Sequence, residues 1–274
     1  MSEGGRIMRL AAAVLLAMLG GVAACDSTTE HDGAPATTSA SHRQATDVYE
    51  VPDQIRDATM VWSAEPGIDL LATEGTLIRA ALESFAIGSL AGLDYTYLGF
   101  ADSSNSVAGG PLYSLFRADT GQGPFAGTLH GHLQQIVPTE AGFDVISCVL
   151  SVGLDVKVDG KYSPSGLAGG EGGELRSRFI RTGEPAKSPV VTQPSSSTGP
   201  DSRHWQAPTG NQFIGWEIDG FTDRDPTTSG NGRCARWARS LYPHTTPAIA
   251  RDAYARDNPP PVQPAYPGWP DSSH

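Results

Sequence analysis

Two histidines stand at a spacing at which both imidazoles can reach one metal ion. His130 and His132 are two residues apart in a stretch that alternates apolar and polar residues, so a strand places both on one face. A zinc site needs at least a third ligand, which only His204, His244 or a distant carboxylate can supply. We therefore interpret the pair as surface or half-buried histidines on a strand, and we expect no metal.

Acid–base chemistry needs a carboxylate or imidazole that faces an apolar pocket, where burial shifts its pKa. Asp144 and His132 lie on predicted strands and are the candidates for a base. Glu217 alternates with Trp216 and Ile218, which favours the solvent face for its side chain. We interpret these groups as solvated sheet positions, because charged residues are seldom buried without a partner.

Two further polar clusters match no complete site. Three aspartates near two glycines suggest hard oxygen ligands for calcium, but their spacing does not match an EF-hand loop. These residues are Asp219, Asp223 and Asp225, with Gly230 and Gly232. Arg176 and Arg178 share a strand face and are able to hold an anion, although such arginines more often pair with acids. No catalytic constellation is complete, and we expect no cofactor.

The N-terminus carries the most specific signal in the chain. Arg6 and Arg9 precede an apolar run over residues 10–19, and small residues follow, which is typical of a secretory signal. The apolar run is shorter than the roughly 20 residues that span a bilayer. The segment Val22-Ala23-Ala24-Cys25 resembles the lipobox of bacterial lipoproteins. This resemblance implies that the Cys25 thiol is alkylated with diacylglycerol and that the chain is cut just before it.

The other two cysteines form an even pair in an exported chain. Export delivers the protein to an oxidising compartment, where disulfides persist. We predict a disulfide between Cys148 and Cys234; the alternative is two buried free thiols.

Composition limits the class of partner. The formal net charge is −11, and nucleic-acid binding needs clustered Lys and Arg, so we expect no nucleic-acid partner. The same charge disfavours anionic headgroups, which leaves the lipid on Cys25 as the attachment to the membrane. We predict a cell-membrane protein that faces away from the cytoplasm. Only three of the 19 basic residues are lysines, which is typical of a high-GC bacterium such as an actinobacterium.

Composition also divides the chain into four parts. Residues 1–24 are the signal peptide, and residues 25–58 are a polar, flexible tether that starts at the lipidated cysteine. Residues 59–245 are predicted to form one domain with a single core. Residues 246–274 are expected to form a short helix and an extended, proline-rich tail.

Within the domain, apolar spacing predicts one main helix followed by strands. The helix is predicted over residues 69–91, and it ends at Gly92. Its expected core stripe is Leu71, Ile78, Leu82 and Phe85, with Arg79 and Glu83 paired on the exposed side. Strands are predicted at 127–137, 143–153, 154–162 with a turn at Asp159-Gly160, 174–182 and 211–219.

The alternation within each strand predicts which residues face the core. The expected core faces are Leu129, Leu133 and Val137; Ile146, Cys148, Leu150 and Val152; Leu175 and Phe179; and Ile214, Trp216 and Ile218. Short helices are expected at Leu112–Phe116, at Cys234–Leu241 and from Pro247 with Thr246 as its cap, and loops at 93–126 and 184–208.

A helix that precedes a meandering sheet is similar to the NTF2-like family, whose members are ketosteroid-isomerase-like cones. The opening segment over residues 61–69, with residues 76–80, also looks like a group of uncharacterised actinobacterial secreted proteins and lipoproteins. The resemblance covers residues 60–240 and implies an α+β fold in which a long N-terminal helix packs on a curved antiparallel sheet. The longer loops at 93–126 and 184–208 depart from the plain family pattern.

From these features we favour a non-enzymatic, surface-tethered domain that binds a small apolar ligand or a protein partner at the cell envelope. One alternative is a small enzyme of the isomerase or dehydratase type, which acts on an apolar molecule inside the cone with Asp144 or His132 as its base. Another is an accessory subunit of an envelope complex, which needs a large exposed apolar patch.

Overall fold

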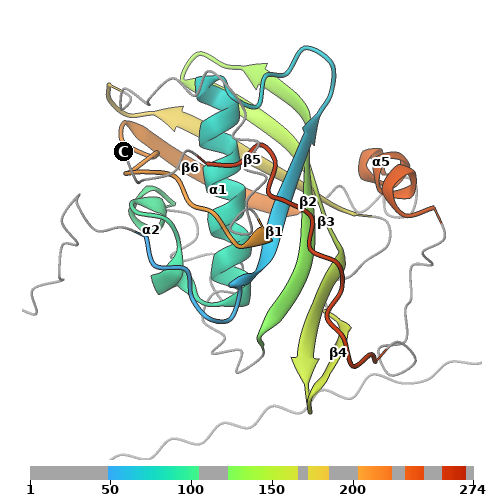
Figure 1. The fold of residues 1–274 in the computed structure, drawn as a ribbon. Helices are drawn as coiled ribbons and strands as arrows, with labels where there is room; N and C mark the ends of the chain where they lie inside the picture. The colour runs from blue at the N-terminus through green and yellow to red at the C-terminus, as the bar shows by residue number, and fades with distance from the viewer. Residues whose placement is uncertain are drawn as a thin grey trace, which may run out of the picture. The chain divides into compact units, whose positions relative to one another are not determined.

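The computed structural model describes residues 49–104, 123–165, 172–184, 203–223, 232–243 and 255–269, which lie in one compact unit. Its centre is a curved six-stranded sheet in the order β1-β2-β3-β5-β6, with β4 paired to β3 (Figure 1). The strands are Asp57–Ala64 (β1), Phe125–Pro138 (β2), Gly142–Val158 (β3), Lys161–Pro164 (β4), Gly173–Arg181 (β5) and Trp216–Asp223 (β6). Only β1 and β2 pair in parallel among these described strands, so the coarse prediction of an α+β fold with a curved, largely antiparallel sheet is confirmed.

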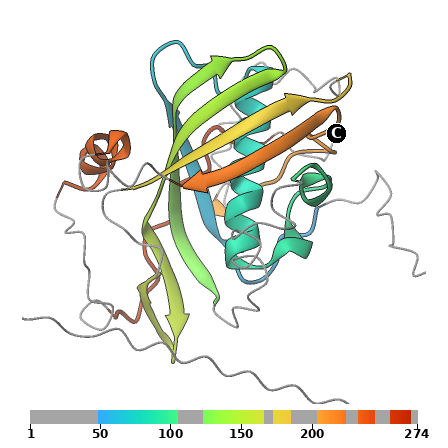
Figure 2. The same cartoon turned by 180° about the vertical axis from the view of Figure 1, so that it is seen from behind.

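Helix α1, Thr73–Leu90, lies within the curve of the sheet (Figures 1 and 2). Ile78 and Leu82 of the predicted stripe are buried, and each contributes about 1.5–3 kcal/mol on burial. Arg79 and Glu83 are also buried, which corrects the prediction that they pair on the exposed side. The smaller helical elements are η1, Leu93–Tyr95, and α2, Phe100–Ser103.

Strand β1 corrects the predicted order of elements, in which the helix came first. Ala58, Met60 and Trp62 alternate into the core, as one face of a strand does. Ile55 is also buried, so the folded part begins before residue 59, where the predicted domain starts. The connection from β1 to its parallel neighbour β2 contains α1, because parallel strands need a long crossover.

Two bulges change which side chains of β2 and β3 face the core. One lies between Leu133 and Gln135, and it leaves Val137 exposed although Val137 was predicted to face the core. On β3 the core-facing residues at the start of the strand are Phe143 and Val145. Of the predicted core residues of β3, Cys148 and Leu150 are fully buried but lie outside the cluster around α1, whereas Ile146 and Val152 are only partly buried.

The rest of the sheet follows the prediction more closely. Asp159 and Gly160 form the predicted turn, with φ of 50° and 81°, which Asp and Gly tolerate better than other residues. Phe179 of β5 is buried, as predicted. Trp216 and Ile218 of β6 are buried as well, but Ile214 lies before the strand and is exposed, which corrects its assignment to the same face.

The proline-rich C-terminal segment is packed rather than free. Residues 255–269 make bridges from Arg256 to Tyr162 and from Tyr266 to Val61, and Trp269 is buried. Because Pro has no N–H, such a segment cannot complete a strand and makes only scattered backbone bonds. The compact unit therefore extends beyond residue 245, where the predicted domain ends.

Several predicted features lie outside the described residues. These are the signal peptide, the tether up to residue 48, the helices at Leu112–Phe116 and after Pro247, most of the loops at 93–126 and 184–208, and Asp225. None of the helices in the described ranges is both long and apolar enough to cross a membrane.

Candidate functional site

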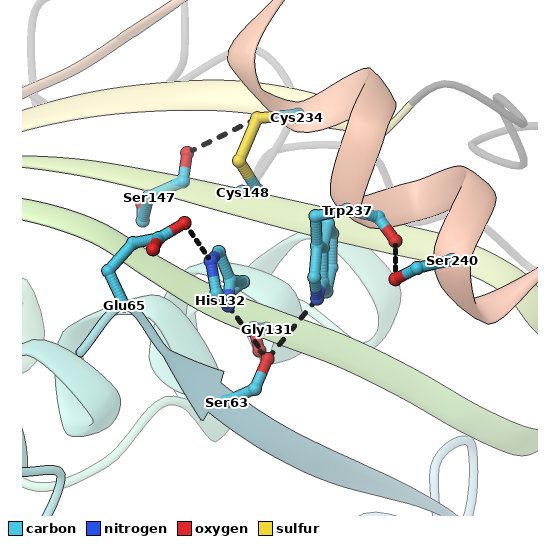
Figure 3. Close-up of polar contacts among 9 residues, drawn as sticks. All are labelled: Ser63, Glu65, Gly131, His132, Ser147, Cys148, Cys234, Trp237 and Ser240. Carbon is cyan, nitrogen blue, oxygen red and sulfur yellow. Dashed lines mark hydrogen bonds and ion pairs between the residues drawn. A yellow bond between two sulfur atoms is a disulfide. The ribbon is translucent and has the colours of Figure 1, made fainter.

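Helix α5, Arg233–Leu241, covers the face of the sheet that points away from α1. Neighbouring residues of β1 show the two sides: Trp62 donates its indole N–H to Glu83 on α1, whereas Ser63 accepts the indole N–H of Trp237 on α5. The Cys148–Cys234 disulfide joins this helix to β3 across 86 residues of chain (Figure 3). The predicted pairing of these two cysteines is confirmed.

His132 lies at the centre of a polar cluster beneath α5 (Figure 3). Its Nδ1 is 2.8 Å from Ser63 Oγ, and its Nε2 is 3.4 Å from Glu65 Oε1. The register of the parallel β1–β2 pair places Ser63 directly beside His132. The indole of Trp237 stacks on the imidazole at a centroid distance of 5.2 Å and donates to Ser63 Oγ at 3.2 Å. We call Ser63, Glu65, His132 and Trp237 the His132 cluster.

Electrostatics keep His132 neutral. Burial lowers its pKa, and the hydrogen bond and charge of Glu65 oppose this shift. A neutral imidazole carries one N–H, and the Glu65 carboxylate only accepts. The proton therefore belongs on Nε2, and Nδ1 accepts the Ser63 hydroxyl proton.

His130 lies on the same face of β2, as predicted, but it has a different partner. Its Nε2 is 3.1 Å from the hydroxyl of Tyr242, which follows α5. Burial lowers the pKa of His130 to about 4 and raises that of Tyr242. His130 is 4 % and His132 6 % exposed, so neither is the surface or half-buried residue that we predicted. Across the described ranges, no three His, Cys, Asp or Glu side chains gather as metal ligands do.

The other predicted site residues lie elsewhere. Asp144 forms an exposed ion pair with Arg178 at 2.7 Å, and Arg176 pairs with Glu174 at 2.9 Å. This pairing confirms that the two arginines bind acids of the same chain. His204 lies beside Asp57, with 3.6 Å between the imidazole and the carboxylate.

A buried carboxylate that the sequence did not indicate lies on the α1 side of the sheet. Glu83 accepts hydrogen bonds from Trp62 Nε1 at 2.8 Å, Tyr97 Oη at 2.7 Å and Trp269 Nε1 at 2.6 Å. Burial raises the pKa of Glu83, while Arg79 and these donors oppose the shift. The four-residue spacing of Arg79 and Glu83 was visible in the sequence, but nothing there indicated that the pair is buried.

Arg79 connects this carboxylate to the C-terminal segment. Its guanidinium lies 4.3 Å from the ring centroid of Trp269 and donates to the Pro267 carbonyl at 2.6 Å. The buried pair therefore fixes the C-terminal segment against α1, and among the described residues Arg79 Nε has no hydrogen-bond partner.

Comparison of the chain with models of known protein families, with curated proteins and with solved structures finds no match.

Proposed function

We propose that the chain is an exported bacterial lipoprotein, held in the cell membrane by a lipid on Cys25 and facing away from the cytoplasm. The support is the order of a basic start, an apolar run and the lipobox-like Val22-Ala23-Ala24-Cys25. The Cys148–Cys234 disulfide agrees with an oxidising compartment. Two or more acyl chains anchor a protein stably, at about 0.8 kcal/mol per buried CH₂.

Fractionation of the host tests the anchor. The chain is expected in the membrane pellet, and Cys25→Ser is expected to move it to a soluble fraction or to leave it unprocessed. A Ser27→Ala variant is the matched control, because it changes a residue near the lipid site and keeps both Cys25 and the disulfide. Equal membrane recovery of wild type and of a Cys25→Ser chain that has lost its signal segment contradicts the proposal.

We further propose that the anchored domain works by binding a ligand or a protein partner, and that it is not a cone-interior enzyme. The observation that carries this proposal is the filled concave side of the sheet. Trp62, Tyr97, Trp205 and Trp269 are buried there around Glu83, whose carboxylate already accepts three hydrogen bonds. A general base must lie within reach of substrate, whereas Glu83 is buried among these donors.

The candidates for a base inside the cone lose support for the same reason. Asp144 is exposed and paired with Arg178, and His132 lies on the face away from α1. We still propose that the domain has the NTF2-like cone fold. The position of α1 within the curved sheet supports this proposal. The strand β1, which precedes α1 and pairs in parallel with β2, is an addition to that plan.

Native mass spectrometry of the chain from its own host tests the binding function. We expect a bound small molecule or a stoichiometric protein partner that is lost on denaturation. The protein is extracted gently from membranes for this measurement. A monomer whose mass shows no bound molecule contradicts the binding proposal.

A further inference from the structure

The shortest contacts of the His132 cluster define an assignment of protons in which the Gly131 carbonyl, 3.4 Å from Ser63 Oγ, is a second and longer acceptor for the Ser63 hydroxyl. Trp237 Nε1–H points to Ser63 Oγ, the Ser63 hydroxyl points to His132 Nδ1, and His132 Nε2–H points to Glu65. The distances along this chain are 3.2, 2.8 and 3.4 Å. A hydroxyl that donates to a neutral imidazole, which an acid orients on its other nitrogen, is the arrangement that activates a serine nucleophile.

The surroundings suit this chemistry as well. The stacked Trp237 holds the imidazole plane, with 18° between the two rings. Burial lowers the pKa of His132, so the imidazole is neutral and ready to accept a proton near pH 7. Ser63 is half-buried and the Glu65 side chain is 51 % exposed, so one edge of the cluster reaches solvent while His132 itself is buried.

We infer that Ser63 is a nucleophile that accepts the acyl group of a carboxylic ester, with His132 as its base and Glu65 orienting that base. This activity goes beyond the proposed binding function and depends neither on the lipid anchor nor on an enzyme site inside the cone.

The reaction balances without a cofactor. Ser63 Oγ bonds to the carbonyl carbon while its proton passes to His132 Nδ1. The carbon–oxygen bond to the alcohol then breaks, and the alcohol leaves with that proton. A water molecule hydrolyses the acyl-serine by the same route, which releases the acid and restores the Ser63 hydroxyl. The Trp237 N–H donates to Ser63 Oγ and holds that atom beside His132.

A biotinylated fluorophosphonate tests the inference, because it modifies activated serines with loss of fluoride. The purified full chain in mild detergent is treated at pH 7.5 and digested with trypsin. The peptide that spans residues 57–79 contains Ser63 as its single serine, so a mass shift on it reports Ser63 directly. We expect modification of wild type and none of Ser63→Ala or of heat-denatured wild type.

Two variants separate activation from mere exposure. His132→Asn is expected to slow the modification by about 100-fold, the usual size of a general-base effect. Glu65→Gln changes an exposed side chain and is expected to slow it at least tenfold with an unchanged melting temperature. Ser240→Ala is the matched control on α5, where the Ser240 hydroxyl donates to the Trp237 carbonyl, and it is expected to react like wild type.

Two results contradict the inference that Ser63 is an activated nucleophile. No adduct on the peptide of residues 57–79 under conditions that modify a known serine hydrolase means that the cluster only attaches α5 to the sheet. An adduct that forms as fast in His132→Asn as in wild type means that Ser63 reacts without activation, and an unchanged rate in Glu65→Gln contradicts the role of Glu65.

Discussion

The buried His130 predicts a loss of stability in mild acid. Its pKa is about 4 in the folded chain, against an ordinary value of 6.5. The unfolded chain therefore takes up a proton on this residue as the pH falls below 6.5, while the folded chain does not until near pH 4. Stability is complete above pH 6.5 and falls as the pH decreases through this window. The loss is about 2 kcal/mol at pH 5 and about 3 kcal/mol below pH 4, at 1.36 kcal/mol per pKa unit.

Urea unfolding of wild type and His130→Gln at pH 7.5 and pH 5.0 measures this contribution. Glutamine retains a polar nitrogen near Tyr242 but does not titrate, and all other groups cancel in the comparison. We expect wild type to lose about 2 kcal/mol more than the variant between the two pH values. Parallel losses in the two proteins refute the reasoning, because the imidazole then titrates alike in the folded and unfolded chains.

Three further perturbations test other parts of the structure. Replacing Cys148 and Cys234 by Ala removes a link across 86 residues and is expected to cost about 4–5 kcal/mol in urea unfolding; an unchanged midpoint contradicts the pairing. Glu83→Gln leaves the buried Arg79 without its counter-charge and is expected to cost about 3 kcal/mol, whereas Glu74→Gln on the same helix changes little; equal effects argue against the buried network. Trp269→Ala removes a buried indole and is expected to cost about 3–5 kcal/mol by thermal unfolding; a neutral result means that the C-terminal segment is not packed as described.

Local sequence patterns predicted the structure correctly where a single physical rule determines the conformation. The spacing of Ile78 and Leu82 predicted helix α1, because an i, i+4 apolar stripe is set by the helical repeat alone. Asp159-Gly160 predicted its turn, because few other residues adopt positive φ without strain. The disulfide followed from counting two cysteines in an exported chain.

Features that depend on distant contacts were missed. The bulge after Leu133 reverses which side chains of β2 face the core. No local sequence pattern indicates that one strand contains an extra residue. Trp269 and Glu83 are 186 residues apart, so neither the burial of the carboxylate nor the packing of the tail was visible locally. The proline-rich composition suggested a free tail, but composition does not report burial.

The candidate site was predictable only in part. The spacing of His130 and His132 placed both on one face of a strand, which is correct. Ser63 and Glu65 reach His132 through the parallel pairing of β1 with β2. Trp237 reaches it because the disulfide attaches α5 to β3. These are long-range arrangements that spacing along the chain does not encode.

The lipid on Cys25 is the claim on which the proposed function depends most directly. Mass spectrometry of the chain from its own host, after trypsin, reports the first residue of the mature protein. We predict a peptide that spans residues 25–43, starts at Cys25 and carries a diacylglyceryl group. A mature chain that begins elsewhere, or the same peptide with an unmodified thiol, contradicts the account.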